Sequence, residues 1–293
     1  MADKKHLGQA AIEYLMTYGW AILIIAVVLG VLYSVGVFNL NMGPKALTGA
    51  CQVYRPDGPG TINFINLAGS CANELPEYVA QFNGQNSYVQ IANSPSLNPA
   101  NALTLAVWYK INSYQPTNMW AQIVGKGINA QYDIAQQPGN PAYVGGSAVL
   151  TNGQIWANAM NSPLNTWEFF VITYSATTGN IISYENGVSL GPLSGSGTIV
   201  TTSDAVFFGV NNFQNAYFNG SIANVQIYNT TLSANEIDAL YQEGIGGAPI
   251  RLNNIVGWWP LNGNANDYSG NNNNGQATNV IYTSSWTSGY SAP

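Results

Sequence analysis

Two hydrophobic patterns divide the sequence. Residues 20–38 are almost wholly apolar and long enough to cross a bilayer as a helix. From about residue 61, short apolar or alternating runs follow one another, separated by Gly, Pro, Asn and Ser. Such runs are typical of strands joined by turns. Together the patterns predict a long N-terminal α-helix followed by an all-β sandwich of jelly-roll type.

The second pattern locates individual elements. Strands are expected at residues 87–91, 103–109, 168–174, 181–184, 205–210, 221–228 and 255–261. Asn186-Gly187 lies between two such runs and predicts a tight hairpin. Residues 232–241 have Ser233 followed three positions later by Glu236, a capping box that predicts one helix in this region.

A charged head precedes the apolar run. Lys4 and Lys5 indicate that the N-terminus stays in the cytoplasm. Glu13 is the only charged residue between Lys5 and Lys45. A helix N-terminus favours an acid, but a lone carboxylate at the edge of a membrane helix is expensive without a partner.

Residues 4–15, KKHLGQAAIEYL, resemble the class III signal peptide of archaeal type IV pilins. The resemblance implies cleavage between Gly8 and Gln9, so that residues 1–8 are the signal peptide. It also implies that residues 9–47 are kept as one helix, which is a membrane anchor first and a filament core later.

The same resemblance gives Glu13 a role in assembly, because the family's acidic residue stands fifth after the cut. It would pair with the new N-terminus of a neighbouring subunit. The partners implied are the prepilin peptidase, the pilus assembly machinery, the cytoplasmic membrane before assembly, and identical subunits in a helical filament. The implied location is an extracellular cell-surface filament.

Residues 48–60 are rich in Pro and Gly and are expected to be a linker. The chain contains two cysteines, Cys51 and Cys71. In an exported protein, two cysteines favour one disulfide. Residues 61–293 are then the outer domain.

Short motifs in this outer domain resemble, in order, a laminin G-like, concanavalin A-like lectin domain. They include residues 82–84, 87–89, 94–97, 103–108, 124–127, 167–169, 184–187, 218–222 and 232–237. Residues 257–261 and 266–271 resemble the opening stretch of that family but come last here, which indicates a circular permutation. The strand at residues 256–261 should then join the sheet of residues 222–228, with Trp258 or Trp259 facing the core.

Charge and composition narrow the chemistry. Charged residues make up 7% of the chain and the net charge is −6, which argues against a nucleic-acid partner. The single histidine, His6, leaves the outer domain without a Ser-His or Cys-His mechanism. The only acids at alternate positions, Glu236 and Asp238, fall in the predicted helix, so a glycosidase pair is not expected. Asp267 and Asn264 are calcium candidates, although the site offers fewer carboxylates than calcium usually needs and an Asx-turn loop is the favoured interpretation.

Aromatic residues make up 12% of the chain and suit sugar stacking. The glycan-contact candidates in loop-rich stretches are Tyr114, Trp120, Tyr132, Tyr143 and Trp156. Asn219 and Asn229 fit the N-glycosylation pattern. The sequence favours a structural pilus subunit whose outer domain adheres to glycans without catalysis. A membrane-anchored monomeric lectin and a surface glycosidase are the alternatives.

Overall fold

The computed structural model describes residues 23–29, 51–56, 62–67, 75–116, 118–127 and 131–293, with the backbone alone for residues 51–56 and 62–67. The chain divides into two compact units, Met1–Ala46 and Leu47–Pro293. In the first unit, residues 23–29 are helical. No helix within the described residues combines the length and apolar character needed to cross a membrane.

Several sequence predictions concern residues that the structure does not describe. These residues are the rest of the predicted helix over residues 9–47, together with Gly8, Gln9 and Glu13. The predicted disulfide is also outside the described part, because the Cys51 side chain and the whole of Cys71 are not described.

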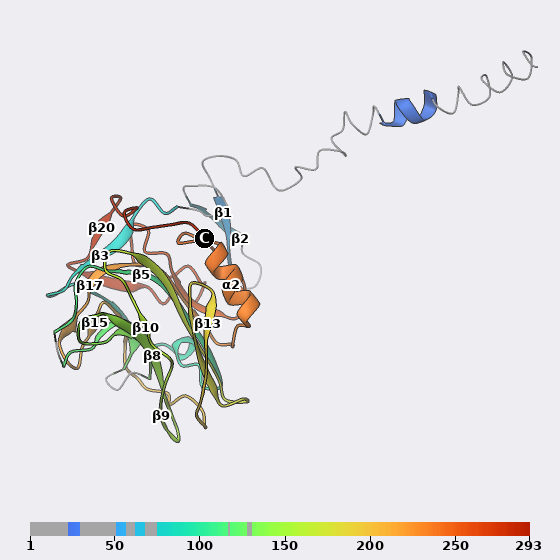
Figure 1. Cartoon of the computed structure of the whole chain (residues 1–293). Helices are drawn as coiled ribbons and strands as arrows, with labels where there is room; N and C mark the ends of the chain where they lie inside the picture. The colour runs from blue at the N-terminus through green and yellow to red at the C-terminus, as the bar shows by residue number, and fades with distance from the viewer. Residues whose placement is uncertain (1–22, 30–50, 57–61, 68–74, 117, 128–130) are drawn as a thin grey trace, which may run out of the picture. The chain divides into compact units, whose positions relative to one another are not determined.

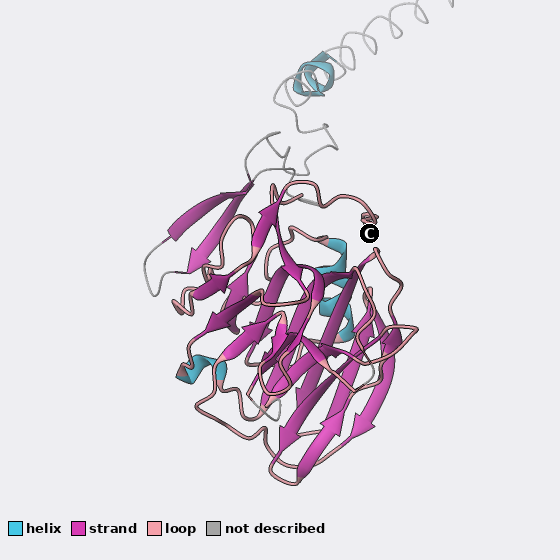
Figure 2. Cartoon of the chain, turned by 90° about the vertical axis from the view of Figure 1, so that its left-hand side faces the viewer, coloured by secondary structure: helices cyan, strands magenta, loops and turns pink. Residues whose placement is uncertain are grey.

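Two antiparallel sheets form the body of the second unit (Figures 1 and 2). The first sheet has the order β10 (Met160–Asn161), β8 (Tyr143–Leu150), β7 (Tyr132–Gln136), β6 (Ala121–Lys126), β14 (Val206–Phe208), β4 (Tyr88–Ile91) and β19 (Gly275–Thr278), with β9 (Gly153–Trp156) paired to β8. The second has the order β13 (Val188–Ser194), β12 (Asn180–Glu185), β11 (Trp167–Ser175), β5 (Ala102–Ile111), β17 (Asn219–Tyr228), β3 (Val79–Asn83) and β20 (Ile281–Thr283), with β18 (Ile255–Trp259) paired to β17. The predicted all-β sandwich is confirmed.

Smaller elements complete the unit. They are the hairpins β1 (Cys51–Pro56) with β2 (Ile62–Leu67) and β15 (Val210–Asn211) with β16 (Ala216–Tyr217), the 3₁₀ turn η1 (Pro95–Leu97) and the helix α2 (Ala234–Gln242). Strand β1 lies within the stretch that the sequence analysis assigns to a linker, residues 48–60. Part of the predicted linker therefore forms a strand.

Both faces of the second sheet are covered, which explains its apolar strands. In β11, Phe170 and Ile172 point into the core between the sheets, whereas Phe169 and Val171 point into a second cluster beneath α2. Successive side chains of a strand alternate between faces. A strand buried on both faces therefore reads as a continuous apolar run.

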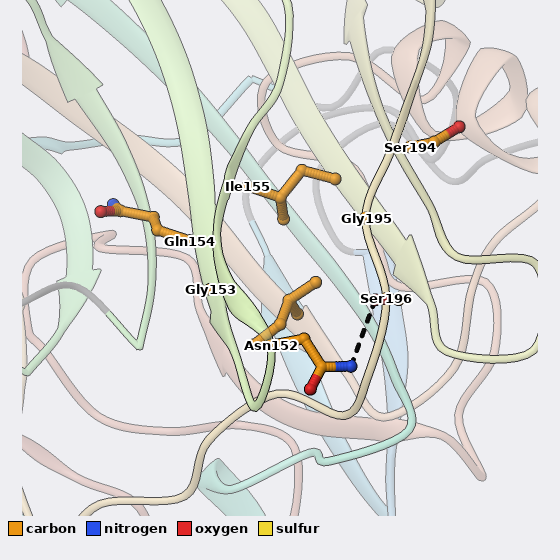
Figure 3. A pocket seen from close by; sticks show the side chains of 8 residues that line it. Asn152, Gly153, Gln154, Ile155, Ser194, Gly195 and Ser196 are labelled. Carbon is orange, nitrogen blue, oxygen red and sulfur yellow. Dashed lines mark hydrogen bonds between the residues drawn. The ribbon is translucent and has the colours of Figure 1, made fainter.

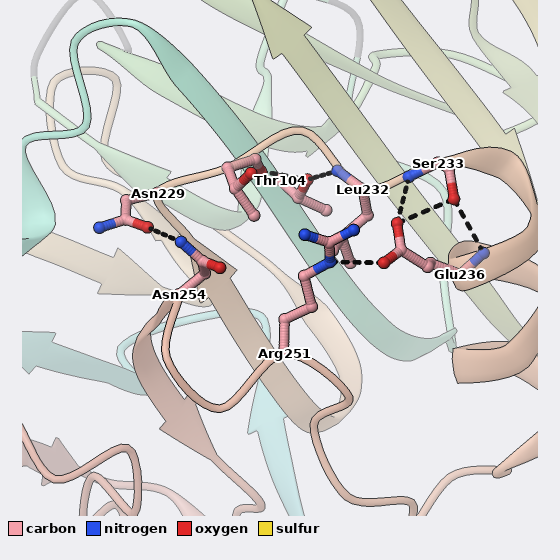
Figure 4. A network of polar contacts seen from close by, with 8 residues as sticks. Thr104, Asn229, Leu232, Ser233, Glu236, Arg251 and Asn254 are labelled. Atoms are coloured by element: carbon pink, nitrogen blue, oxygen red, sulfur yellow. Dashed lines mark hydrogen bonds and ion pairs between the residues drawn. The ribbon is translucent and has the colours of Figure 1, made fainter.

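The predicted helix and hairpin are both confirmed. Ser233 caps α2: its hydroxyl accepts from the Glu236 backbone N–H, and the Glu236 carboxylate accepts from the Ser233 N–H (Figure 4). Arg251 forms an ion pair with Glu236. Asn186 and Gly187 join β12 to β13, both with positive φ, at 46° and 81°, as a primed hairpin turn requires.

The C-terminal tail supplies strands to both sheets. β18 pairs with β17, β19 with β4 and β20 with β3. Trp258 and Trp259 are both buried. The predicted strand at residues 256–261 and its pairing with residues 222–228 are therefore confirmed.

Candidate functional site

One row of side chains crosses the outer face of the first sheet. Its members stand directly opposite one another on seven strands: Gln276, Gln90, Phe207, Gly125, Asp133, Ser147 and Trp156. Their chain neighbours Val124, Ile134 and Ala148 lie in the core between the sheets. Because successive residues alternate faces, this outer-face row points away from that core.

The centre of the row is small and polar. The Ser147 hydroxyl donates to Asp133 Oδ1 at 2.7 Å and accepts from Gln154 Nε2 at 3.2 Å. The Gln122 side chain lies over Gly125, where a Cβ would fall 2.5 Å from Gln122 Cδ. Any side chain at position 125 would therefore displace this amide. These contacts hold amide, hydroxyl and carboxylate groups close together on the sheet.

Asp133 is a buried carboxylate, with 6% of its surface exposed. Burial raises its pKa to about 6, although hydrogen bonds from Ser147 and Gln122 oppose the shift. Burying a charge without a counter-ion weakens a fold. A buried carboxylate with a raised pKa is therefore a candidate ligand-binding residue.

Two tryptophans meet beside this centre. The ring centroids of Trp120 and Trp156 are 5.2 Å apart, with 47° between the ring planes. Trp120 directly precedes β6 and Trp156 ends β9, so the rings meet above the intervening strands β7 and β8. The outward residues there include the cross-strand pair Ala135 and Gly145, and the space above Gly145 is taken by Ala159 and the Gln137 side chain. Trp156 remains 46% exposed, and Trp120 is half-buried.

A second aromatic pair lies further along the row. Tyr88 and Phe207, both half-buried, have ring centroids 6.1 Å apart. Four strand spacings separate Phe207 on β14 from Trp156 on β9, which is about 19 Å at roughly 4.8 Å per strand. The outer face thus has aromatic surfaces at two places with a small polar centre between them.

The five predicted glycan contacts differ in how exposed they are in the structure. Tyr114, Tyr143 and Trp156 are exposed, and Trp120 is half-buried. Tyr132 is wrong as a surface candidate: it is fully buried in the core, its hydroxyl donates to the Leu97 carbonyl at 3.1 Å, and burial raises its pKa above the ordinary range. Tyr132 lies one residue before Asp133, so its side chain takes the opposite, inward face of β7.

The two calcium candidates are both engaged in hydrogen bonds. Asp267 is buried, and its two carboxylate oxygens accept from the backbone N–H groups of Trp258, Ser269 and Asn273 and from the Ser269 hydroxyl, at 2.8–3.0 Å. Asn264 Oδ1 accepts from the Asn266 N–H. Four donors aimed at one carboxylate suit a loop anchor rather than a calcium ligand. The arrangement favours the Asx-turn interpretation of Asp267 over the calcium one.

The two glycosylation candidates differ in setting. Asn219 is half-buried, and its Nδ2 donates to Ser113 Oγ at 2.9 Å. Asn229 is exposed, and its Oδ1 accepts from Asn254 Nδ2 at 3.1 Å (Figure 4). That bond uses the amide oxygen rather than the nitrogen that would carry a glycan. Asn229 is thus the more accessible acceptor.

A cavity of about 430 Å³ lies apart from the outer-face row. It is formed by the β8–β9 hairpin and by the segment that leaves β13 (Figure 3). Its lining residues are Leu150, Asn152, Gly153, Gln154, Ile155, Ser194, Gly195 and Ser196, none of which is charged.

Comparison with known proteins agrees with this fold. The chain belongs to the concanavalin A-like lectin/glucanase superfamily, whose laminin G-type family model matches residues 83–238. No curated protein gives a significant match.

Many solved structures of low sequence identity are similar in fold. A Bacteroides ovatus protein assigned to carbohydrate binding has a TM-score of 0.56 at 14% identity, over 77% of this chain and 64% of the other. The chain thus spans less than two thirds of that relative. A heptameric SAP-like pentraxin of Limulus polyphemus has a TM-score of 0.51 at 15% identity, over 70% of this chain and 94% of the other.

Proposed function

We propose that the outer face of the first sheet binds neutral glycans. The observation that carries this proposal is the Trp120–Trp156 pair beside the small polar centre of the outer-face row. Aromatic faces pack against the C–H groups of a sugar ring, and amide, hydroxyl and carboxylate groups pair with its hydroxyls. The superfamily membership and the carbohydrate assignment of the Bacteroides ovatus relative support the same function.

The proposed role is binding without catalysis. Hydrolysis of a glycosidic bond ordinarily needs two carboxyl groups on either side of it. The outer-face row contains one, Asp133, whose cross-strand partners are Gly125 and Ser147. A surface glycosidase is therefore the weaker alternative.

We further propose that the domain is displayed on an extracellular filament. The support is the sequence alone: Gly8-Gln9, Glu13 and the apolar run match the pilin pattern in register. A filament presents many copies, so weak single sites add up to firm adhesion. The competing arrangement is a monomeric lectin held in the membrane by the same segment.

A glycan array tests the binding proposal. The full-length chain, in a zwitterionic detergent without a sugar headgroup, is applied with and without calcium, both as monomer and as assembled filaments. We expect binding to neutral glycans that Trp156→Ala weakens. Absence of binding in every condition contradicts the proposal and leaves a resemblance of fold alone.

A further inference from the structure

The Tyr88–Phe207 pair gives the outer-face row a second aromatic surface, which the Trp120–Trp156 proposal does not use. Tyr88 and Phe207 stand on the neighbouring strands β4 and β14, and each side chain is half-buried. The chain neighbours of Phe207, Val206 and Phe208, lie in the core between the sheets. Phe207 therefore points to the same face as Trp156, with part of its ring open to a ligand.

The surface between the two aromatic pairs is low and polar. Three short residues separate Phe207 from Trp156 along the row: Gly125, Asp133 and Ser147. All three are buried. Two amides lie against them, because Gln122 lies over Gly125 and Gln154 donates to Ser147. Amide side chains have both donors and acceptors for the hydroxyls of a sugar.

The spacing of the aromatic pairs bears on the size of the ligand. About 19 Å separates Phe207 from Trp156 at roughly 4.8 Å per strand, and a single sugar ring is much shorter than this span. Asp133 is the only charged member of the row, and the row continues beyond Phe207 with the exposed amides Gln90 and Gln276. A neutral chain of several sugar units can therefore contact both aromatic pairs at once.

We propose that the outer face binds several consecutive units of an extended neutral glycan chain, which crosses the strands from Trp156 to Phe207. Sugar units at the two ends of this stretch pack on the two aromatic pairs. Units between them pair their hydroxyls with the amides of Gln122 and Gln154. This inference rests on the proposed glycan-binding function, to which it adds the class of glycan and a second contact surface.

Pairs of short and long saccharides from the same neutral polymers test this inference. They are cellobiose with cellohexaose, mannobiose with mannohexaose, and maltose with maltohexaose. Calorimetric titration of the full-length chain, in the detergent used for the array, is expected to show at least about tenfold tighter binding of the hexasaccharide in a series that binds.

Three variants locate the origin of that advantage. Phe207→Ala should remove most of the hexasaccharide advantage and leave the affinity for the disaccharide unchanged. Trp156→Ala should weaken binding of both lengths. Phe213→Ala removes a ring that is 65% exposed and lies outside the row. It is the matched control and should change neither affinity.

The outcomes separate this inference from the proposed function. Equal affinity for the two lengths overturns the extended-chain inference alone, and so does a hexasaccharide advantage that Phe207→Ala leaves intact in folded protein. Such an advantage would come from the number of positions at which a long chain can meet one small site. Array binding that includes none of the three hexasaccharides also overturns this inference alone. If no glycan binds the unmodified chain, both proposals fail.

Discussion

Trp258 and Trp259 are neighbours in sequence, yet their indoles are buried on opposite faces of β18. Trp259 lies in the core between the sheets and packs edge-on against Phe208, with ring centroids 5.2 Å apart. Trp258 lies in the cluster beneath α2 and donates from Nε1 to Asn224 Oδ1 at 2.9 Å. One short strand from the tail therefore completes both apolar clusters.

Removal of the tail should unfold the domain. A chain that ends at Gly247 loses β18, β19 and β20, which exposes the edges of β17, β4 and β3 as well as both clusters. We expect aggregation and no cooperative thermal transition by calorimetry. A soluble truncation that melts cooperatively would show instead that the tail is an accessory.

The buried Asp133 predicts an unusual pH dependence of stability. Its folded-state pKa, about 6, lies above the ordinary value of 3.8. The folded state therefore binds more protons between these values, and stability should fall as pH rises through this window. Asp133→Asn should raise the free energy of unfolding at pH 7 by up to about 3 kcal/mol and change it little below pH 4.

Urea denaturation at both pH values measures this effect. Asp238→Asn, an exposed acid on α2, is the matched control and should change stability little. An Asp133→Asn variant that is less stable at pH 7 would contradict the account. If the variant is more stable but binds glycan less well, the domain retains a destabilising carboxylate for the sake of binding.

The capping box should stabilise the fold by about as much as a single helix cap usually does. Ser233→Ala removes the hydroxyl that accepts from the Glu236 N–H and should lower the free energy of unfolding by about 1 kcal/mol. Ser284→Ala, an exposed serine in the tail, serves as control. Equal stability of the two variants in thermal melts would mean that the Arg251–Glu236 ion pair holds the helix start without the cap.

In the proposed filament, assembly of the subunits depends on Glu13. Glu13→Ala should leave the outer domain folded but prevent filament growth, because the carboxylate would no longer neutralise a neighbouring N-terminus. Negative-stain microscopy of sheared surface material, with mass spectrometry for a chain beginning at Gln9, provides the readout. Normal filaments from this variant would favour the membrane-anchored lectin.

Strong local patterns made part of the fold predictable. The capping box at Ser233, the Asn186-Gly187 turn and the apolar run of β11 each correspond to a physical requirement that one segment satisfies by itself. Strands β6 to β9 lack such a pattern. Their outward positions include Gly125, Ala135 and Gly145, and small residues give little alternation of apolar and polar character.

The same strands carry the candidate site, so the site was only partly predictable. Trp120 and Trp156 could be proposed because exposed aromatics in loop-rich stretches are informative. Their approach to 5.2 Å depends on strand order in the sheet, which no local pattern encodes. Asp133 is part of the candidate site because it stands opposite Ser147 on the neighbouring strand. Tyr132 was misplaced because a one-residue change in position reverses the face of a strand.

The most direct test of the central claim is the affinity of the full-length chain for its best array glycan after removal of one tryptophan. Trp156→Ala should weaken binding at least about tenfold, the equivalent of roughly 1.4 kcal/mol, with an unchanged melting temperature. The control Ile281→Ala removes a side chain that is 64% exposed at the edge of the second sheet and should bind as the unmodified chain does. Undiminished binding by Trp156→Ala would contradict the assignment of this face as the glycan site.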